Sequence, residues 1–161
     1  RQDKRMANMA KNKKINKAQR DIVMLIREKF GSKFQITLEE PFQFDATSYR
    51  PDVVVRSSNG KVIKAIIEIE QCSRKHVVGG VITADYCMGL PEYKQKQKSA
   101  IYVLSLKEGN TEDYRKRIKM LKQYVRNLKT IVIGNKDEVI DALMRINPLN
   151  YIYRRRKRLR K

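Results

Sequence analysis

A short polar segment, Ser-Ser-Asn-Gly at 57–60, separates two apolar segments, and this feature restricts the fold more than any other. The first apolar segment is 51–56, which begins with Pro-Asp, and the second is 62–70, which ends with Glu-Ile-Glu. Asn-Gly between two apolar runs is typical of a tight turn that joins antiparallel strands. The two segments are therefore predicted to be neighbouring antiparallel strands of one sheet.

Three carboxylates lie in this hairpin, at Asp52, Glu68 and Glu70. Residues two apart in a strand point to one face, so Glu68 and Glu70 emerge together while Ile67 and Ile69 face the other layer. With Asn-Gly at the centre of the turn, Asp52 pairs with Ile67 and lies diagonal to Glu68. Mutual repulsion of three carboxylates is costly unless a divalent cation neutralises it, and oxygen ligands select Mg²⁺ or Mn²⁺.

Two other interpretations apply to charged and metal-ligating side chains in this region. The hairpin acids can form surface ion pairs, with Lys61, Lys64 or Arg74 as partners, although such pairs rarely coincide with an isoleucine-rich buried strand. Zinc is the other interpretation, and its ligands would be Cys72, His76 and Cys87. That spacing fits no common structural zinc site, and a fourth ligand is lacking.

The remaining patterns predict helices and strands that alternate around the hairpin. A 3.6-residue apolar period predicts a helix over about 15–30, ended by Gly31, and a strand follows over 34–38. Further helices are predicted over about 73–88, from Thr111, and after an N-terminal capping pair of Asn135 and Glu138, with strands over 100–106 and 130–133. This order indicates one α/β domain over 15–150, with a mixed sheet flanked by helices.

The net charge narrows the range of possible functions. The chain has 37 Lys and Arg residues and 17 Asp and Glu residues, which gives +20. Residues 1–20 carry +7, residues 154–161 carry +7, and the body between them carries +6. We therefore predict a basic N-terminal arm over 1–14 and a basic C-terminal tail over 151–161. Basic arms on a globular body are typical of proteins that bind a polyanion such as nucleic acid. A solvated tail or a nuclear-localisation segment is the alternative.

The sequence also predicts the cellular compartment. No apolar run approaches the roughly 18 residues of a membrane span, and the first twenty residues are polar and basic. Two cysteines are too few for a disulfide framework, which fits a reducing compartment. The expected location is the cytoplasm or nucleoid, or the nucleus if the source is a eukaryote or its virus, and no membrane association is expected.

The hairpin motif resembles that of the PD-(D/E)XK nuclease superfamily, which includes restriction enzymes, Holliday-junction resolvases and repair nucleases. The family motif is Pro-Asp, a spacer, and then acidic-X-Lys, within a core of helix, three strands, helix and strand. Here Pro51-Asp52, fifteen residues and Glu68-Ile69-Glu70 fill this pattern, and the predicted element order matches over about 15–106. The resemblance implies a restriction-endonuclease-like αβββαβ core, with a C-terminal α-β-α extension.

The resemblance also implies the chemistry, which is metal-dependent hydrolysis of DNA phosphodiester bonds with Mg²⁺ or Mn²⁺ as cofactor. Asp52 and Glu68 would ligate the metal, together with the backbone carbonyl of Ile69. Glu70 stands where the family usually has Lys. A minority of restriction enzymes resemble this chain in having Glu there, which implies a third ligand or the general base that orients the water.

Further cations and acids outside the motif have roles that remain open. Lys75 or Arg74 can replace the missing motif lysine, since some relatives have moved their Lys to this helix. Asp21 and Glu28 on the first helix are either site acids or ordinary solvated charges. Contacts to nucleic acid are predicted for Arg74, Lys75 and the tail residues Arg154, Arg155, Arg156, Lys157 and Arg158.

The expected partner is duplex or branched DNA, with no small-molecule cofactor. One domain holds one such site, so cleavage of both strands calls for a homodimer or for successive nicks. The alternative function is a catalytically inactive nuclease fold, or another basic module that binds DNA or RNA. A ribosome-associated or chromatin-associated protein is a third interpretation.

Overall fold

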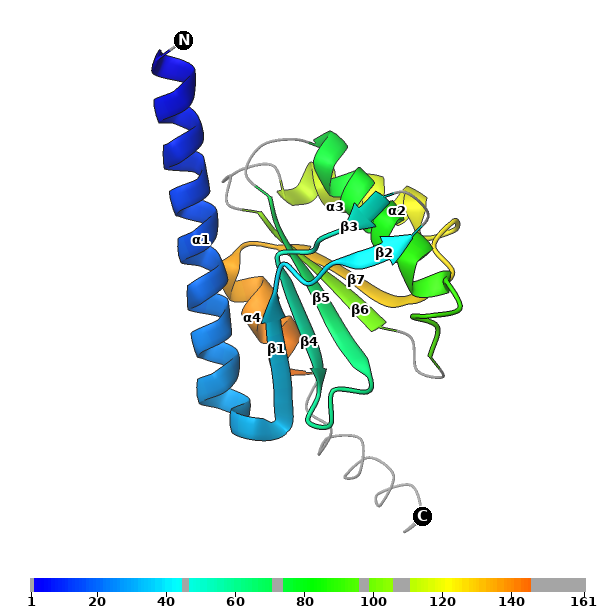
Figure 1. Ribbon diagram of the computed structural model, residues 1–161. Coiled ribbons are helices and arrows are strands. Elements are labelled where there is room, and N and C mark those ends of the chain that lie inside the picture. The colour runs from blue at the N-terminus through cyan, green and yellow to red at the C-terminus, as the bar shows by residue number, and fades with distance from the viewer. Residues whose placement is uncertain (1, 45–46, 71–73, 96–98, 106–110, 146–161) are drawn as a thin grey trace.

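The chain folds into a mixed five-stranded sheet with helices on both faces (Figure 1). The computed structural model describes residues 2–44, 47–70, 74–95, 99–105 and 111–145, of which 2–15, 74–75, 105 and 111–114 are described by backbone alone. The strands lie in the order β1 (Phe34–Leu38), β4 (Val53–Ser57), β5 (Ile63–Glu70), β6 (Ser99–Ser105) and β7 (Leu128–Gly134). Strand β4 is antiparallel to both of its neighbours, β1 and β5, whereas β5, β6 and β7 run parallel to one another. This arrangement confirms the predicted α/β class with a mixed sheet.

Four α-helices cover this sheet in the described part of the chain, namely α1 (Gln2–Phe30), α2 (Arg74–Gly89), α3 (Thr111–Leu121) and α4 (Lys136–Met144). Helices α2 and α3 cover one face, and α1 and α4 cover the other (Figure 1). Helix α1 begins at Gln2, so most of the segment predicted as an arm continues the predicted helix. At its other end a 3-10 turn, η1 (Gly31–Lys33), starts at Gly31 with φ of +53°, and the helix stops where the sequence predicts.

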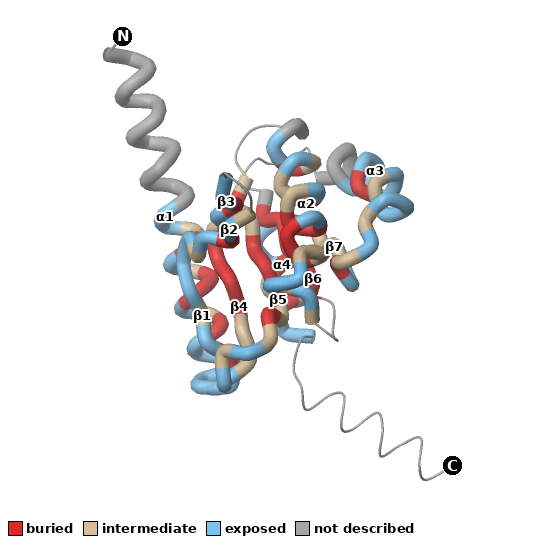
Figure 2. Tube along the Cα trace, turned by 45° about the vertical axis from the view of Figure 1, so that its right-hand side comes forward, coloured by how far each residue is buried: buried red, intermediate tan, exposed pale blue. Residues whose placement is uncertain are grey.

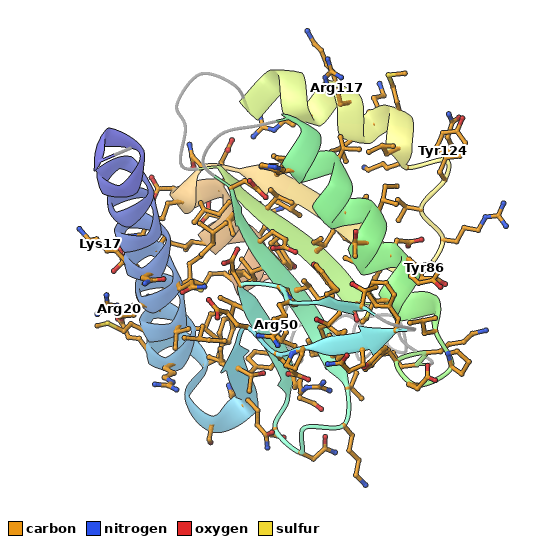
Figure 3. All side chains as sticks on the ribbon, turned by 45° about the horizontal axis from the view of Figure 1, so that its top comes forward. Lys17, Arg20, Arg50, Tyr86, Arg117 and Tyr124 are labelled. Carbon is orange, nitrogen blue, oxygen red and sulfur yellow. The ribbon has the colours of Figure 1, made fainter. Side chains whose placement is uncertain are left out.

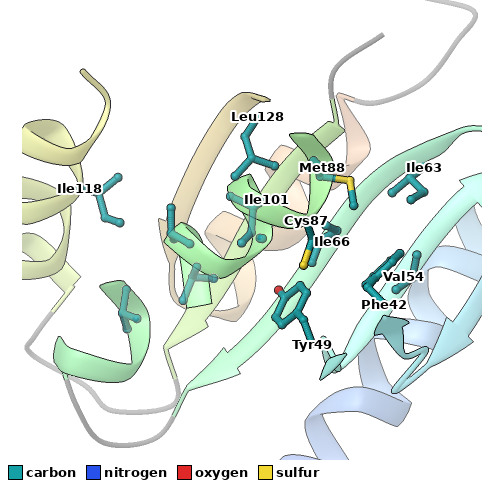
Figure 4. Close-up of a cluster of buried hydrophobic side chains, with 14 of the residues drawn as sticks. Phe42, Tyr49, Val54, Ile63, Ile66, Cys87, Met88, Ile101, Ile118 and Leu128 are labelled. Carbon is teal, nitrogen blue, oxygen red and sulfur yellow. The ribbon is translucent and has the colours of Figure 1, made fainter. Parts of the chain in front are cut away.

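Two buried hydrophobic layers sandwich the sheet, because alternate residues of each strand point to opposite faces. Figure 2 shows the buried residues concentrated in the central strands. Ile66 and Ile101 pack toward α2, in the layer drawn in Figure 4. Ile67 and Ile69 pack in the other layer with residues of α1 and α4, as the alternation in 62–70 predicts. Glu68 and Glu70 therefore share the face that α2 covers.

A second hairpin, β2 (Phe42–Phe44) and β3 (Thr47–Tyr49), was not predicted from the sequence. Each strand has three residues, which is too short for a two-residue period to stand out. The hairpin is held by its aromatic side chains, because Phe42 is fully buried and stacks on Tyr49 with ring centroids 6.0 Å apart. It lies over the α2 face of the sheet and brings Tyr49 into the interior (Figures 1 and 4).

The register of the central hairpin differs from the predicted one by one residue. Val53 pairs with Ile67 and Val55 with Ala65, whereas Arg56 pairs with Ile63, so the strands slip at a β-bulge. The predicted pairing of Asp52 with Ile67 is wrong, and one step beyond the Val53 pair Asp52 comes opposite Glu68. Asp52 directly precedes the first paired residue of β4, and its carboxylate bonds to Gln19 of α1 and to the backbone N–H of Ile69.

A buried carboxylate, Asp85 of α2, fixes the connection between α3 and β7. It accepts hydrogen bonds from the backbone N–H groups of Arg126 at 3.1 Å, Asn127 at 2.7 Å and Leu128 at 2.9 Å. Three converging donors satisfy a buried carboxylate that would otherwise be costly to desolvate. The turn before β7 is therefore held by one side chain from a neighbouring helix.

Replacing Asp85 by Ala is expected to lower the free energy of unfolding by about 3 kcal/mol, because three N–H groups lose their acceptor at a largely buried site. Urea denaturation followed by circular dichroism measures this loss. Asp85→Asn retains one acceptor oxygen and should be destabilised less. A loss below about 0.5 kcal/mol in the Ala variant would contradict this role, because surface substitutions fall in that range.

Candidate active site

Asp52 and Glu68 meet at one edge of the sheet, where β5 ends and the chain enters β4. The Asp52 Oδ2 atom accepts a hydrogen bond from the backbone N–H of Ile69 at 2.7 Å. This bond locks the carboxylate of the first motif residue to the backbone of the second motif segment. The two acids that the sequence selects as metal ligands are therefore held side by side by main-chain geometry.

Two neutral side chains orient these acids, and the sequence analysis missed both. Gln19 of α1 donates from Nε2 to Asp52 Oδ1 at 3.0 Å. The Tyr49 hydroxyl of β3 donates a short hydrogen bond to Glu68 Oε1. Both side chains are buried, with 4% of Gln19 and 8% of Tyr49 exposed, so their polar atoms are committed to the carboxylates.

The signal for Gln19 was present in the sequence. Val23, Ile26 and Phe30 follow it at spacings that place all four on one face of a helix, and all four are buried. A polar residue on such a face needs a buried partner. Tyr49 had no comparable signal, because its strand was not recognised.

The acids predicted on the first helix do not reach the site. The Asp21 carboxylate pairs with Lys136 Nζ of α4 at 3.0 Å, and this pair lowers the Asp21 pKa. Glu28 is exposed on the helix surface. The contribution of α1 to the site is therefore the amide of Gln19. Asp21 and Glu28 are ordinary surface charges, which is one of the two roles that the sequence left open for them.

Glu70 follows Glu68 by two residues in β5 and therefore lies on the same face of that strand. Its Oε2 atom is 4.0 Å from Nδ1 of His76, the histidine near the start of α2. Within the described residues, no group of three or more His, Cys, Asp or Glu side chains is arranged to hold a metal. The geometry therefore brings together the pair Asp52 and Glu68, and the role of Glu70 as a third ligand or base stays a prediction.

Helix α2 closes over the pair at a glycine. A Cβ atom at Gly80 would lie 3.7 Å from the Glu68 side chain, in ordinary van der Waals contact. The packing of α2 on the sheet therefore does not itself require glycine at either position of the Gly-Gly pair. Elsewhere in this helix Cys87 is fully buried in the core while the His76 side chain is 62% exposed, so the two do not form the zinc set considered above.

Burial dominates the electrostatics of the two acids. It raises the Asp52 pKa, against the hydrogen bonds from Ile69 and Gln19. It raises the Glu68 pKa to about 8, with the charges of Asp52 and Glu70 adding to the effect and the Tyr49 hydrogen bond opposing it. No described Lys or Arg side chain forms an ion pair with Asp52 or Glu68. Among the described side chains this pair therefore has no cationic partner, and its raised pKa keeps a proton on Glu68 at neutral pH.

Replacing Glu68 by Gln is expected to stabilise the metal-free protein at pH 8. Between pH 4.5 and about 8 the unfolded state loses the Glu68 proton while the folded state keeps it, so stability falls as the pH rises through this range. Gln does not titrate, and the gain at pH 8 is at most about 5 kcal/mol, since each unit of pKa shift corresponds to about 1.4 kcal/mol.

The measurement is urea denaturation with chelator at pH 5 and pH 8, with exposed Glu92→Gln as the matched control. The Glu68→Gln variant should gain stability at pH 8 relative to pH 5, and the control should not. An equal change at both pH values would contradict the raised pKa.

Several predicted site residues lie outside what the structure describes. Arg74 and Lys75 are the first residues of α2 and are described by backbone alone, so their side chains are not placed. The tail residues Arg154, Arg155, Arg156, Lys157 and Arg158 lie beyond the last described residue, and Cys72 also lies outside the described residues. Their roles in binding or catalysis stay predictions.

The described helices include none whose length and apolar character together suffice to cross a membrane. Comparison of the chain with protein-family models, with curated proteins and with solved structures finds no match in any of the three.

Proposed function

We propose that this chain is a metal-dependent endonuclease that hydrolyses DNA phosphodiester bonds. The observation that carries the proposal is the pair Asp52 and Glu68, two carboxylates from adjacent strands that are held together in a largely buried site by neutral donors. Such a pair is costly without a cation, and enzymes tolerate costs of this kind at functional sites.

The arrangement of elements supports a restriction-endonuclease-like core. Helix α1, strands β1, β4 and β5, helix α2 and strand β6 occur in the order expected of that core, with the β2–β3 hairpin inserted between β1 and β4. Elements α3, β7 and α4 then form the expected C-terminal extension.

The donor set fits a hard divalent cation. Mg²⁺ in phosphate chemistry is usually held by one or two carboxylates and several waters, so Asp52 and Glu68 suffice without a third acid. The backbone carbonyl of Ile69, between Glu68 and Glu70, is a further ligand in this proposal. When bound, the cation polarises a phosphate oxygen and lowers the pKa of a water molecule.

The other groups of the site hold the two carboxylates in place or act on the attacking water. Gln19 and the Ile69 N–H fix both oxygens of Asp52, and Tyr49 fixes one oxygen of Glu68. Glu70, beside His76 at the same edge, orients the attacking water as a general base in this proposal. Lys75, at the start of α2, is the alternative source of a cation for the developing charge.

The decisive experiment incubates the purified protein with supercoiled plasmid and with a branched DNA, in Mg²⁺, in Mn²⁺ and in chelator. Nicked or linear products should form with either metal and be absent with chelator. Cleavage that persists in chelator, or no cleavage of any substrate with either metal, would contradict the proposal.

A second function, binding of nucleic acid without cleavage, is favoured by two observations. Glu70 replaces the motif lysine, and the described residues form no group of three metal-ligating side chains. Manganese binding separates the two functions. A site that binds Mn²⁺ and loses it in Asp52→Ala supports the nuclease, whereas equal Mn²⁺ affinity in both proteins supports the binding module.

A further inference from the structure

The charge of the globular body is concentrated in one segment. Residues 115–129 contain seven Lys and Arg residues and no acidic residue. Residues 21–153 together carry +6, so without this segment their net charge is −1. Helix α3 also contains Glu112 and Asp113 in its first turn, so the positive charge of the body belongs to the part of α3 from Arg115 onward and to the connection to β7.

The fold displays this charge on one surface. Helix α3 packs on the sheet layer through Ile118, which is 4% exposed, with Leu121 and Val125 against the same core. The basic residues of this segment are exposed, and Figure 3 shows the labelled Arg117 pointing outward. Lys116, Lys119, Lys122 and Lys129 are all exposed, and no described residue forms an ion pair with any of them.

Two large side chains lie among these lysines in contact with solvent. Met120 is 70% exposed and Tyr124 is 67% exposed. The Tyr124 side chain points away from the sheet (Figure 3). Aromatic and apolar groups next to basic side chains offer stacking surfaces for nucleic-acid bases.

The surface is rigidly attached to the fold. Asp85 holds the turn before β7, and the Arg115 guanidinium bonds to the Ile133 carbonyl at 3.3 Å and to Glu138 at 2.5 Å. Between α3 and β7 lies a cleft of about 280 Å³, whose rim includes Lys119 and Lys122. Charges on a fixed frame bind a ligand with less loss of conformational entropy than charges on a free arm.

The surface starts at the edge that holds the candidate active site. Strand β6 ends at Ser105, which pairs with Glu70 of β5, and α3 follows β6 in the chain. Figure 1 shows α3 beginning near that edge and running back over the α2 face. Its eleven residues span about 16 Å, which is the length of several nucleotides along a backbone.

We propose that the exposed face of α3 and the turn that follows it bind the sugar-phosphate backbone of a nucleic acid. Charge argues for this occupant, because the four exposed lysines that form no ion pair with a described residue, Lys116, Lys119, Lys122 and Lys129, complement a row of phosphates. The proposal deepens the proposed function, but the binding it describes does not require cleavage.

The test compares two triple variants of the full chain. Lys116→Gln, Lys119→Gln and Lys122→Gln together form the α3 variant. Lys29→Gln, Lys33→Gln and Lys61→Gln form the control, which loses the same charge from exposed positions at the opposite edge of the sheet. Binding to a 30-base-pair duplex and a 30-nucleotide single strand is measured in chelator over a range of salt concentrations, with thermal unfolding as a check of folding.

The α3 variant should bind at least about tenfold more weakly at 0.1 M salt. The plot of log affinity against log salt concentration should also become less steep, its slope changing by about two. The control should change by less than about threefold. Equal losses in both variants, or no loss in the α3 variant, would overturn the proposal. An equal loss of binding to poly-L-glutamate would assign the surface to acidic protein segments and overturn it as well. Since chelator prevents metal-dependent cleavage, a failure of the proposed nuclease activity leaves this result unaffected.

Discussion

Replacing Asp52 by Ala is expected to abolish metal-dependent cleavage, with a loss of at least about 10³-fold in rate. The substitution removes one of the two carboxylates of the proposed metal site, together with the acceptor of the Gln19 and Ile69 hydrogen bonds. DNA binding should persist or become stronger, because a negative charge next to the phosphates is removed. Plasmid cleavage and duplex binding of the same preparation measure the two effects separately.

Two control variants separate loss of the ligand from loss of structure. Gln19→Ala removes one hydrogen-bond donor to Asp52 while the carboxylate remains, and its cleavage rate should fall by about tenfold. Asp141→Asn removes an exposed acid elsewhere and should cleave at the unmodified rate. An Asp52→Ala variant that still cuts at the unmodified rate would exclude this residue from the active site.

Replacing Glu70 by Gln is expected to lower turnover by about 10²-fold, because it retains the shape of the side chain and removes the base or ligand charge. Cleavage rates with Mg²⁺ and Mn²⁺ at saturating DNA measure this loss. Manganese should reduce the defect if Glu70 is a ligand, because Mn²⁺ binds carboxylate and water sites more tightly than Mg²⁺ in most proteins.

The substitution Glu70→Lys restores the usual family motif and gives a second measurement of the same residue. Loss of activity would mean that the site depends on a third carboxylate. A gain would mean that the natural chain is attenuated and that its function is binding. If neither Gln nor Lys changes the rate, Glu70 has no part in the chemistry and Lys75 is the next residue to replace.

Local patterns predicted most of the secondary structure because the physical causes were local. The Asn135 and Glu138 pair forms the predicted capping box of α4. Helix α3 begins at the predicted Thr111 and ends at Leu121, and Ile118 and Leu121 pack against the core. Alternation in 62–70 places Ile67 and Ile69 in one layer and the acids on the other face.

The register of the hairpin could not be read from the sequence in the same way. A two-residue Asn-Gly turn predicts one pairing, and a β-bulge between Val55 and Arg56 produces another. A bulge depends on how the two strands pack against the layers on both sides, so neither strand encodes it alone. Its consequence is that Val53, and not Asp52, pairs with Ile67.

The sequence by itself determined that Asp52 and Glu68 belong together, the order of the elements apart from the β2–β3 hairpin, and the concentration of charge in 115–129. Only the tertiary structure decided what surrounds those acids. Gln19 lies 33 residues before Asp52, and Tyr49 lies 19 residues before Glu68 on a strand too short to recognise. Hydrogen bonds between residues so far apart exist only after α1 and the β2–β3 hairpin have packed on the sheet. Periodicity within one element predicts which side of it is buried, but not which buried partner it meets.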